Sequence, residues 1–346
     1  MIHGHGDDIF RYSDIRANFS SNVYNHFDHR ALYAHLARHM ECLAHYPAPA
    51  PEQMERRLAE TLGIDASEVM VTAGGTEAIY LTAQAHRRSR SVIVQPTFSE
   101  YADACRVHEH RVAYVYPHQM SAGEDGRDAW VPAGCEVVWM CNPNNPTGQV
   151  WPRADLLRLV REYPATLFVL DASYAPFTEQ PLISPCEGVE LPNLLMLHSI
   201  TKEYGLPGLR LGYVTAQAAL LETLRRMRMP WTVNPLALEA GLWLVDHRVG
   251  YRLPLRELME ERERVSRELC RLGIVEVWPS DSHMLLCRLR MGRADNLKEF
   301  LATHHGLLIR DASNFEGLDA GYFRIAVQTA EEDDQMIKAI TEWIES

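Results

Sequence analysis

The sequence predicts an α/β protein: a large domain with a mostly parallel, seven-stranded sheet between helices, and a smaller α+β domain. Three observations lead to this expectation. The chain has 346 residues, which suits one large and one smaller domain better than a single small core. Seven short apolar runs follow residue 51, and amphipathic stretches separate several of them. After about residue 217, longer helical patterns and shorter strands take over.

The seven apolar runs have apolar residues on both faces, which is typical of strands buried inside a parallel sheet. They lie at residues 69–72, 91–95, 112–115, 136–140, 167–170, 194–198 and 211–214. Helices are expected at 51–62, with Pro51 in the first turn and Gly63 as the stop, at 77–87 and at 153–162. Alternation of strands and helices predicts a parallel sheet covered by helices.

The last third of the chain predicts a second unit. A helix is expected at 255–272, where Glu and Arg recur at i, i+3 and i+4, and another at 331–344. Short strands are expected around Val275, Leu285, Leu307 and Phe323. The predicted division is an N-terminal arm with part of the small domain (1–40), a large domain (41–240) and a small C-terminal domain (241–346).

Composition and charge argue against several classes of protein. A net charge of -12 disfavours a broad nucleic-acid surface. No apolar run approaches the roughly 20 residues of a membrane helix, and the N-terminus lacks the pattern of a secretory signal. Seven cysteines without a Cys-x-x-Cys pair make a poor disulfide framework. We therefore expect a cytoplasmic protein that binds neither nucleic acid nor membrane.

The segment HSITKEYGLPGLRLGY begins at His198, at the end of a predicted strand, where open α/β sheets bind ligands. Ser199 and Thr201 precede Lys202, and Arg210 follows it eight residues later. The amine of Lys202 can condense with an aldehyde, while the hydroxyls and the guanidinium can hold a phosphate. For this segment alone, a surface lysine at a strand end remains an equal alternative.

Asp171 and Tyr174 follow the buried run at 167–170. A carboxylate in this position is costly unless a cation pairs with it, and a protonated pyridine nitrogen is such a cation. Keeping that nitrogen protonated makes a pyridine ring an electron sink, and Tyr174 could reach a phenolic oxygen on the same ring. The alternative is that Asp171 caps a turn.

Two more segments leave predicted strand ends. In CNPNNPTG, two prolines and a glycine make a rigid turn from which Asn145 can be aimed. In TAGGTEA, the N–H groups of Gly75 and Thr76 open a helix and can bind a phosphate. The second segment lacks the G-x-G-x-x-G spacing, which excludes a nicotinamide-binding fingerprint.

Taken in order, these motifs resemble the fold-type-I, class I and II aminotransferase family, from about His5 to Ile344. The resemblance implies the PLP-dependent transferase fold, with pyridoxal 5'-phosphate (PLP) as the cofactor. It also implies that Lys202 holds the cofactor covalently and moves protons, that Asp171 pairs with the pyridine nitrogen, and that Tyr174 belongs to the catalytic set. Tyr46 is implied to reach the site of a neighbouring subunit, so a homodimer is expected.

The remaining implied cofactor contacts divide by the part of PLP that they touch. Asn145 and Tyr174 are implied to contact the 3'-oxygen, and Phe98 to stack on the ring. The phosphate is implied to be held by Ser199, Thr201, Arg210 and the N–H groups of Gly75 and Thr76.

The implied substrate-binding residues are His5, Asn145, Arg310 and Arg324, with Arg324 at the α-carboxylate. In an acidic chain, convergent cations suggest a second anionic group on the substrate, such as a phosphate. The segments at 5–9, 199–210 and 309–318 resemble a group within the family that decarboxylates L-threonine O-3-phosphate for cobalamin biosynthesis.

Three alternatives stay open. The first is transamination of histidinol phosphate or a similar phosphorylated amine, which the motifs do not distinguish from decarboxylation. The second is a non-catalytic ligand sensor, which the retained Lys202, Asp171 and Arg210 disfavour. The third is a zinc site at His3, His5, Asp7 and Asp8. Sequence-adjacent ligands without second-shell partners make poor closed sites, so no metal is expected.

Overall fold

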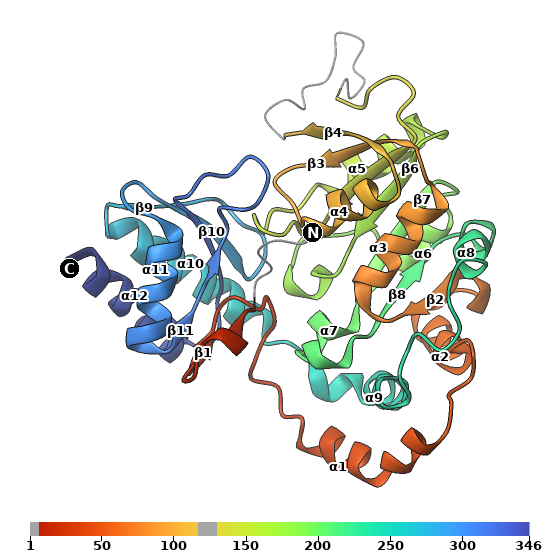
Figure 1. Ribbon diagram of the computed structural model, residues 1–346, viewed down its shortest axis with the longest axis horizontal. Helices are drawn as coiled ribbons and strands as arrows, with labels where there is room; N and C mark the ends of the chain where they lie inside the picture. The colour runs from red at the N-terminus through yellow and green to blue at the C-terminus, as the bar shows by residue number, and fades with distance from the viewer. Residues whose placement is uncertain (1–6, 117–129, 346) are drawn as a thin grey trace.

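A computed structural model describes residues 7–116 and 130–345. Its two main sheets lie side by side, each with its own helices (Figure 1). The larger sheet has seven strands in the order β2-β8-β7-β6-β5-β3-β4. These are β2 (Val69–Thr72), β3 (Arg90–Val94), β4 (Arg111–Val115), β5 (Val137–Cys141), β6 (Leu167–Asp171), β7 (Leu194–Ser199) and β8 (Gly212–Thr215). Only β8 runs antiparallel to its neighbours, which confirms the predicted mostly parallel sheet.

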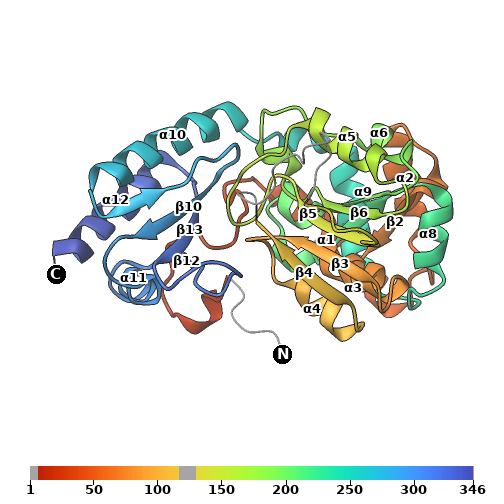
Figure 2. The same ribbon diagram turned by 90° about the horizontal axis from the view of Figure 1, so that it is seen from above.

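Helices cover both faces of this sheet, which is why its strands are apolar on both sides (Figure 2). One face packs against α3 (Gly74–Ala85), α4 (Glu100–Val107) and α8 (Ala218–Arg225). The other packs against α5 (Arg153–Glu162), and α6 (Pro185–Val189) contacts β7 and β8. A further apolar cluster joins β2 and β8 to α1 (Arg30–Arg38), α2 (Glu52–Leu62) and α9 (Pro235–Asp246).

Helix boundaries follow from local chemistry. Helix α2 ends at Leu62 because Gly63, at φ 70°, takes the left-handed cap conformation, as the sequence predicts. Helix α3 begins at Gly74, three residues before the predicted start, because its first two residues are glycines and carry no side-chain pattern. Ser199 is the N-cap of a short helix, α7 (Ile200–Glu203), which carries Lys202.

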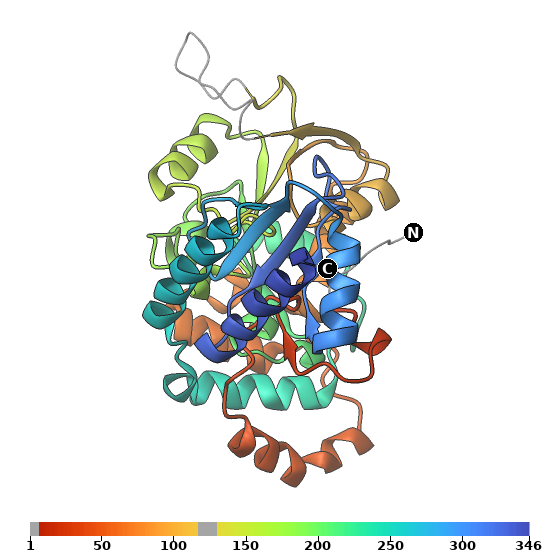
Figure 3. The same cartoon turned by 90° about the vertical axis from the view of Figure 1, so that its left-hand side faces the viewer.

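The smaller sheet has four antiparallel strands in the order β12-β13-β10-β9. They are β9 (Val275–Val277), β10 (Met284–Leu289), β12 (Arg310–Asp311) and β13 (Tyr322–Ala326). The helices that accompany it are α10 (Leu255–Arg271), α11 (Ala294–Phe300) and α12 (Ala330–Glu345). In Figure 3 these helices, coloured teal to dark blue, lie in front of the sheet, on the side away from the larger sheet.

The two ends of the chain meet beside the smaller sheet. Strand β1 (Ala17–Asn18) pairs in parallel with β11 (Leu307–Leu308), and Phe19 is buried in the same apolar core as the C-terminal helix. Helix α1, by contrast, packs on α9. Where the domain boundaries fall along the chain stays a prediction. None of the helices within 7–116 and 130–345 combines the length and apolar character needed to cross a membrane.

Candidate active site

A cavity of about 250 Å³ lies at the ends of β5, β6 and β7, where residues of β12 and β13 close over it. Its walls bring together almost all of the predicted site residues. They are Gly75, Thr76, Phe98, Asn145, Asp171, Tyr174, Ser199, Thr201, Lys202, Arg210, Arg310 and Arg324. Carboxyl ends of neighbouring parallel strands meet at one edge of a sheet, so motifs that end separate strands converge there.

Two predicted residues lie elsewhere. Tyr46 does not line the cavity of its own chain: it is 85% exposed, and its ring lies 5.4 Å from that of Trp231, centroid to centroid. That it reaches a neighbouring subunit stays a prediction. His5 lies outside the described residues.

The amine of Lys202 points into the cavity, and its Nζ donates a 2.8 Å hydrogen bond to the carbonyl oxygen of Ser21. Burial, and after it the positive charge of Arg324, lowers the pKa of Lys202 to about 8. A substantial fraction of this amine is therefore neutral near physiological pH, which is the form that attacks a carbonyl.

Asp171 is the last residue of β6 and is buried. Its Oδ2 accepts a 2.6 Å hydrogen bond from Tyr101, and its Oδ1 accepts one of 2.9 Å from the backbone N–H of Ser173. Within the described part of the chain, no Lys, Arg or His forms an ion pair with it. A buried carboxylate with hydrogen bonds but no cation suits a ligand that brings a positive charge.

Tyr174 is buried beside this carboxylate, and Nδ2 of Asn22 donates a 3.0 Å hydrogen bond to its hydroxyl. Burial raises the pKa of Tyr174. Asn22 has a left-handed backbone (φ 55°), and its Oδ1 has no hydrogen-bond partner among the residues described. Such an unsatisfied buried acceptor in a cavity wall suits a bound ligand that donates to it. No sequence motif indicates this position of Asn22 in the cavity wall.

Arg310 and Arg324 are directly opposite one another on β12 and β13, and both are buried. Arg324 donates to the carbonyl oxygen of Ser20 at 2.6 Å and to Oδ1 of Asn145; Arg310 donates to Oδ1 of Asn314 at 2.7 Å. Burial lowers the pKa of Arg324 to about 9 and that of Arg310 to about 10. Opposed like charges on paired strands are unfavourable unless an anion lies between them.

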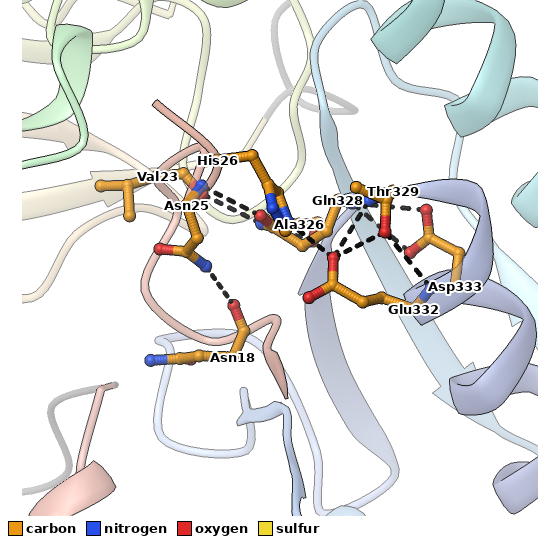
Figure 4. Close-up of polar contacts among 9 residues, drawn as sticks. All are labelled: Asn18, Val23, Asn25, His26, Ala326, Gln328, Thr329, Glu332 and Asp333. Carbon is orange, nitrogen blue, oxygen red and sulfur yellow. Dashed lines mark hydrogen bonds and ion pairs between the residues drawn. The ribbon is translucent and has the colours of Figure 1, made fainter. Parts of the chain in front are cut away.

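The segment that supplies Ser20, Ser21 and Asn22 is fixed to the start of α12 (Figure 4). The N–H of Asn25 donates to Oε1 of Gln328 at 3.1 Å, and Nε2 of Gln328 donates to the carbonyl of Val23 at 3.0 Å. His26 and Glu332 lie 2.6 Å apart, Nε2 to Oε2. The N-terminal wall of the cavity is thus held by the C-terminal helix.

At the opposite end of the cavity, the helix start at Gly75 and Thr76 faces the side chain of Arg210. A methyl group on Gly74 would lie 3.0 Å from the Arg210 guanidinium, and one on Gly212 would lie 2.8 Å from the carbonyl of His198. The glycines therefore allow strand, helix start and arginine to approach closely. Free helical N–H groups beside a guanidinium form a phosphate cradle.

These groups fit PLP. The cradle matches its phosphate, Asp171 matches a protonated ring nitrogen, and Lys202 is an amine that can bond its aldehyde. The fit rests on three separate features of the cavity, each at a different wall.

Residues 15–340 match the family described as aminotransferase class I and II. The chain belongs to this family of PLP-dependent enzymes, which confirms the predicted fold class and cofactor.

Similar proteins include threonine-phosphate decarboxylases and histidinol-phosphate aminotransferases. Threonine-phosphate decarboxylase of Salmonella typhimurium is 31% identical over 88% of this chain and 85% of its own. The solved L-threonine-O-3-phosphate decarboxylase from Porphyromonas gingivalis is 38% identical, with a TM-score of 0.90, covering 95% of this chain and 100% of that one. A histidinol-phosphate aminotransferase of Thermoanaerobacter sp. is 28% identical over 86% of this chain and 84% of its own.

Proposed function

We propose that this enzyme decarboxylates L-threonine O-3-phosphate to (R)-1-aminopropan-2-yl phosphate, a step of cobalamin biosynthesis. The observation that carries the proposal is the pair of opposed, buried arginines, Arg310 and Arg324, in the cavity that contains Lys202. A substrate with both a carboxylate and a phosphate supplies two anions to this pair. The similarity to two threonine-phosphate decarboxylases, at 31% and 38% identity, supports the same substrate.

Arg324 is proposed to bind the α-carboxylate. Its hydrogen bonds to Asn145 and to the carbonyl of Ser20 fix the plane of the guanidinium, so the carboxylate is held in one orientation. Arg310 is proposed to bind the substrate phosphate. Two anchors on neighbouring strands restrict rotation about the bonds at Cα. His5 remains a proposed further contact to the substrate.

Orientation at Cα decides which reaction follows. PLP, when bound, supplies an electron sink for the electron pair left by a bond that breaks perpendicular to its ring. The proposal therefore requires Arg324 and Arg310 to hold the substrate so that the bond between Cα and the carboxylate carbon, and not the Cα–H bond, is the one that breaks. Asp171 is proposed to hold the proton on the ring nitrogen, and Lys202 Nζ to deliver a proton to Cα after carbon dioxide leaves.

The other contacts are proposed to hold the cofactor in position beside Lys202 and Asp171. Phe98 would pack on the ring, and Asn145 and Tyr174 would contact its 3'-oxygen. Its phosphate would be held by Gly75, Thr76, Ser199, Thr201 and Arg210. Tyr46 of one subunit is proposed to contact the phosphate bound in the other, so that the working enzyme is a homodimer.

The test is an assay of the PLP-loaded enzyme with L-threonine O-3-phosphate and no keto acid. We expect carbon dioxide and the amine phosphate in equal amounts. L-Threonine, which lacks the phosphate, is the matched control and should react far more slowly. Absence of carbon dioxide release from the phosphorylated substrate would contradict the proposal.

Transamination of histidinol phosphate or a similar amine is the second candidate, because histidinol-phosphate aminotransferases also match over most of the chain. It predicts glutamate as a product when histidinol phosphate and the PLP-loaded enzyme are incubated with 2-oxoglutarate. If glutamate forms in this assay and L-threonine O-3-phosphate releases no carbon dioxide, transamination replaces decarboxylation as the proposed reaction.

A further inference from the structure

A second group of potential ligand side chains lies outside the cavity, between α1 and α9. It consists of His35, His39 and Glu239. Nε2 of His35 lies 2.6 Å from Oε1 of Glu239, Nε2 of His39 lies 3.9 Å from the same oxygen, and one ligand atom from each residue lies within 4.8 Å of the others. The two imidazole rings are 4.2 Å apart, centroid to centroid.

The packing of α1 turns both histidines toward α9. Leu32 is fully buried and Leu36 packs on the same apolar cluster, and with His35 and His39 they follow the three- and four-residue spacing of one helix face. That face meets α9, on which Glu239 lies, so two helices supply the three side chains.

Hydrogen bonding sets the tautomer of His39. Its Nδ1 lies 2.8 Å from the carbonyl oxygen of His35, which can only accept, so Nδ1 carries the hydrogen. In neutral His39 the lone pair is therefore on Nε2, the atom that faces Glu239. A backbone carbonyl that fixes the ring and tautomer of a histidine is the usual outer-shell arrangement of a metal ligand.

The ion-pair partners of Glu239 also favour a metal site. In the described regions its carboxylate has no Lys or Arg partner, and its only ion-pair contacts are to the two histidines. Side chains at this site are neither fully exposed nor fully buried, with 18% exposure for His35 and 28% for Glu239. A dication can therefore reach the group from solvent and be held by a carboxylate that has no competing cation.

We propose that His35 Nε2, His39 Nε2 and the Glu239 carboxylate bind a zinc ion, with water as the fourth ligand. Imidazole nitrogen and carboxylate oxygen are ordinary zinc ligands, and tetrahedral geometry separates two ligand atoms by about 3.3 Å. The present separations from Oε1 of Glu239, 2.6 and 3.9 Å, lie on either side of that value, and one ligand atom from each of the three residues lies within 4.8 Å of the others. As the ion takes the place of the hydrogen on His35 Nε2, this nitrogen gives its proton to solvent and Nδ1 carries a proton, so the ring binds zinc as a neutral imidazole.

Such a site would link α1 to α9. The 3-10 turn Met40–Ala44 directly follows His39 and leads to Tyr46. Zinc would thus reduce the mobility of the segment that places Tyr46, without taking part in the reaction of the main cavity.

The experiment is a calorimetric zinc titration of the EDTA-treated, PLP-loaded enzyme in a phosphate-free buffer, with metal content measured after dialysis. We expect one zinc per chain that raises the melting temperature. His39→Gln and Glu239→Gln should each weaken zinc binding by about 100-fold or more, because loss of an outer-shell group alone costs about 10- to 100-fold and these residues are direct ligands. His247→Gln is the matched control, because His247 follows α9 and lies outside the three-residue group.

Cobalt(II) provides a second readout. Its visible absorption should show tetrahedral coordination with histidine in the wild-type enzyme and in His247→Gln, but not in the double variant His35→Gln/His39→Gln. Retention of the PLP absorbance would show that the double variant is folded. Equal zinc affinity in the wild type and in the double variant would overturn the proposal, as would equal losses in His39→Gln and His247→Gln.

Discussion

The hydroxyl of Tyr101 donates a 2.6 Å hydrogen bond to Oδ2 of Asp171, and it is the only side-chain donor to that carboxylate among the described residues. Burial raises the pKa of Tyr101 well above its usual value, and the neighbouring Asp171 charge raises it further. The phenol therefore keeps its proton and remains a donor. Tyr101, a residue of α4, thus holds the carboxylate at the end of β6 in position.

Replacing Tyr101 by Phe should leave Oδ2 of Asp171 without its donor. Loss of a hydrogen bond to a buried charged group costs about 1–3 kcal/mol, so urea unfolding should show a decrease of that size. PLP affinity, measured by absorbance titration, should fall as well. Tyr114→Phe, on β4 of the same sheet, is the control. Equal PLP affinity in Tyr101→Phe and the wild type would contradict the positioning role.

Lys202→Ala should abolish turnover because no other amine would replace its Nζ in the cavity. Borohydride reduction of the PLP-loaded wild type, followed by peptide mapping, should find the label on Lys202. Lys338→Ala removes an exposed lysine of α12 and should leave turnover unchanged. A label on any other side chain, or appreciable turnover by Lys202→Ala, would refute the assignment.

The lowered pKa of Lys202 predicts how cofactor capture depends on pH. The neutral amine is the reacting form, so the rate of PLP capture by the apoenzyme should rise with pH and level off above about 8. Stability has a related dependence. Between pH 8 and the unfolded value of 10.5, the unfolded chain binds the extra proton, so the apoenzyme should gain stability as pH rises. Stopped-flow absorbance and urea unfolding measure the two effects, and a capture rate independent of pH would contradict the first.

Arg310→Gln should separate substrate binding from stability. The loss of a charged contact to the substrate phosphate, worth about 1.5–3 kcal/mol, should weaken substrate binding by about 10- to 100-fold. The free energy of unfolding of the ligand-free protein should change less than substrate binding, because losing the charge opposite Arg324 offsets the loss of the hydrogen bond to Asn314. Arg290→Gln is the control, because Arg290 forms an exposed ion pair with Glu276. Steady-state kinetics and thermal unfolding provide the two readouts; an unchanged KM would exclude Arg310 from the substrate site.

Tyr46→Phe should weaken PLP retention if the subunits share their sites, since the hydroxyl would be lost from the neighbouring phosphate. Tyr33→Phe removes the hydroxyl of another exposed tyrosine and serves as the control. The measurement is PLP content after dialysis, together with molar mass by light scattering. If the protein is a dimer and Tyr46→Phe retains as much PLP as Tyr33→Phe, the subunits do not share the site through Tyr46.

The apolar patterns were sufficient for the sheet because buried parallel strands need apolar residues on both faces. All seven predicted strands of the larger sheet occur within a residue of their expected limits. The direct pairing of Arg310 with Arg324 was not predicted, because it depends on the register of β12 and β13. The motifs at strand ends predicted part of the cavity wall, including Asp171, Lys202 and Arg210.

The contacts that were not predicted depend on tertiary structure. Tyr101 is one of several apolar-face residues of α4, and nothing in its neighbours indicates that its hydroxyl meets Asp171. Lys202 donates to a backbone carbonyl, that of Ser21, which no side-chain pattern can report. The group of His35, His39 and Glu239 joins segments about two hundred residues apart, so spacing along the chain gave no sign of it.

The pairing of β1 with β11, and the contacts of Gln328 with Val23 and Asn25, have a consequence for synthesis on the ribosome. Lys202 emerges long before Arg324 and Gln328 are made, whereas Ser20 to Asn22 reach their places only when those late residues arrive. The cavity therefore cannot be enclosed on a growing chain, and a translation product that stops before β13 would expose its reactive lysine without the guanidinium that faces it.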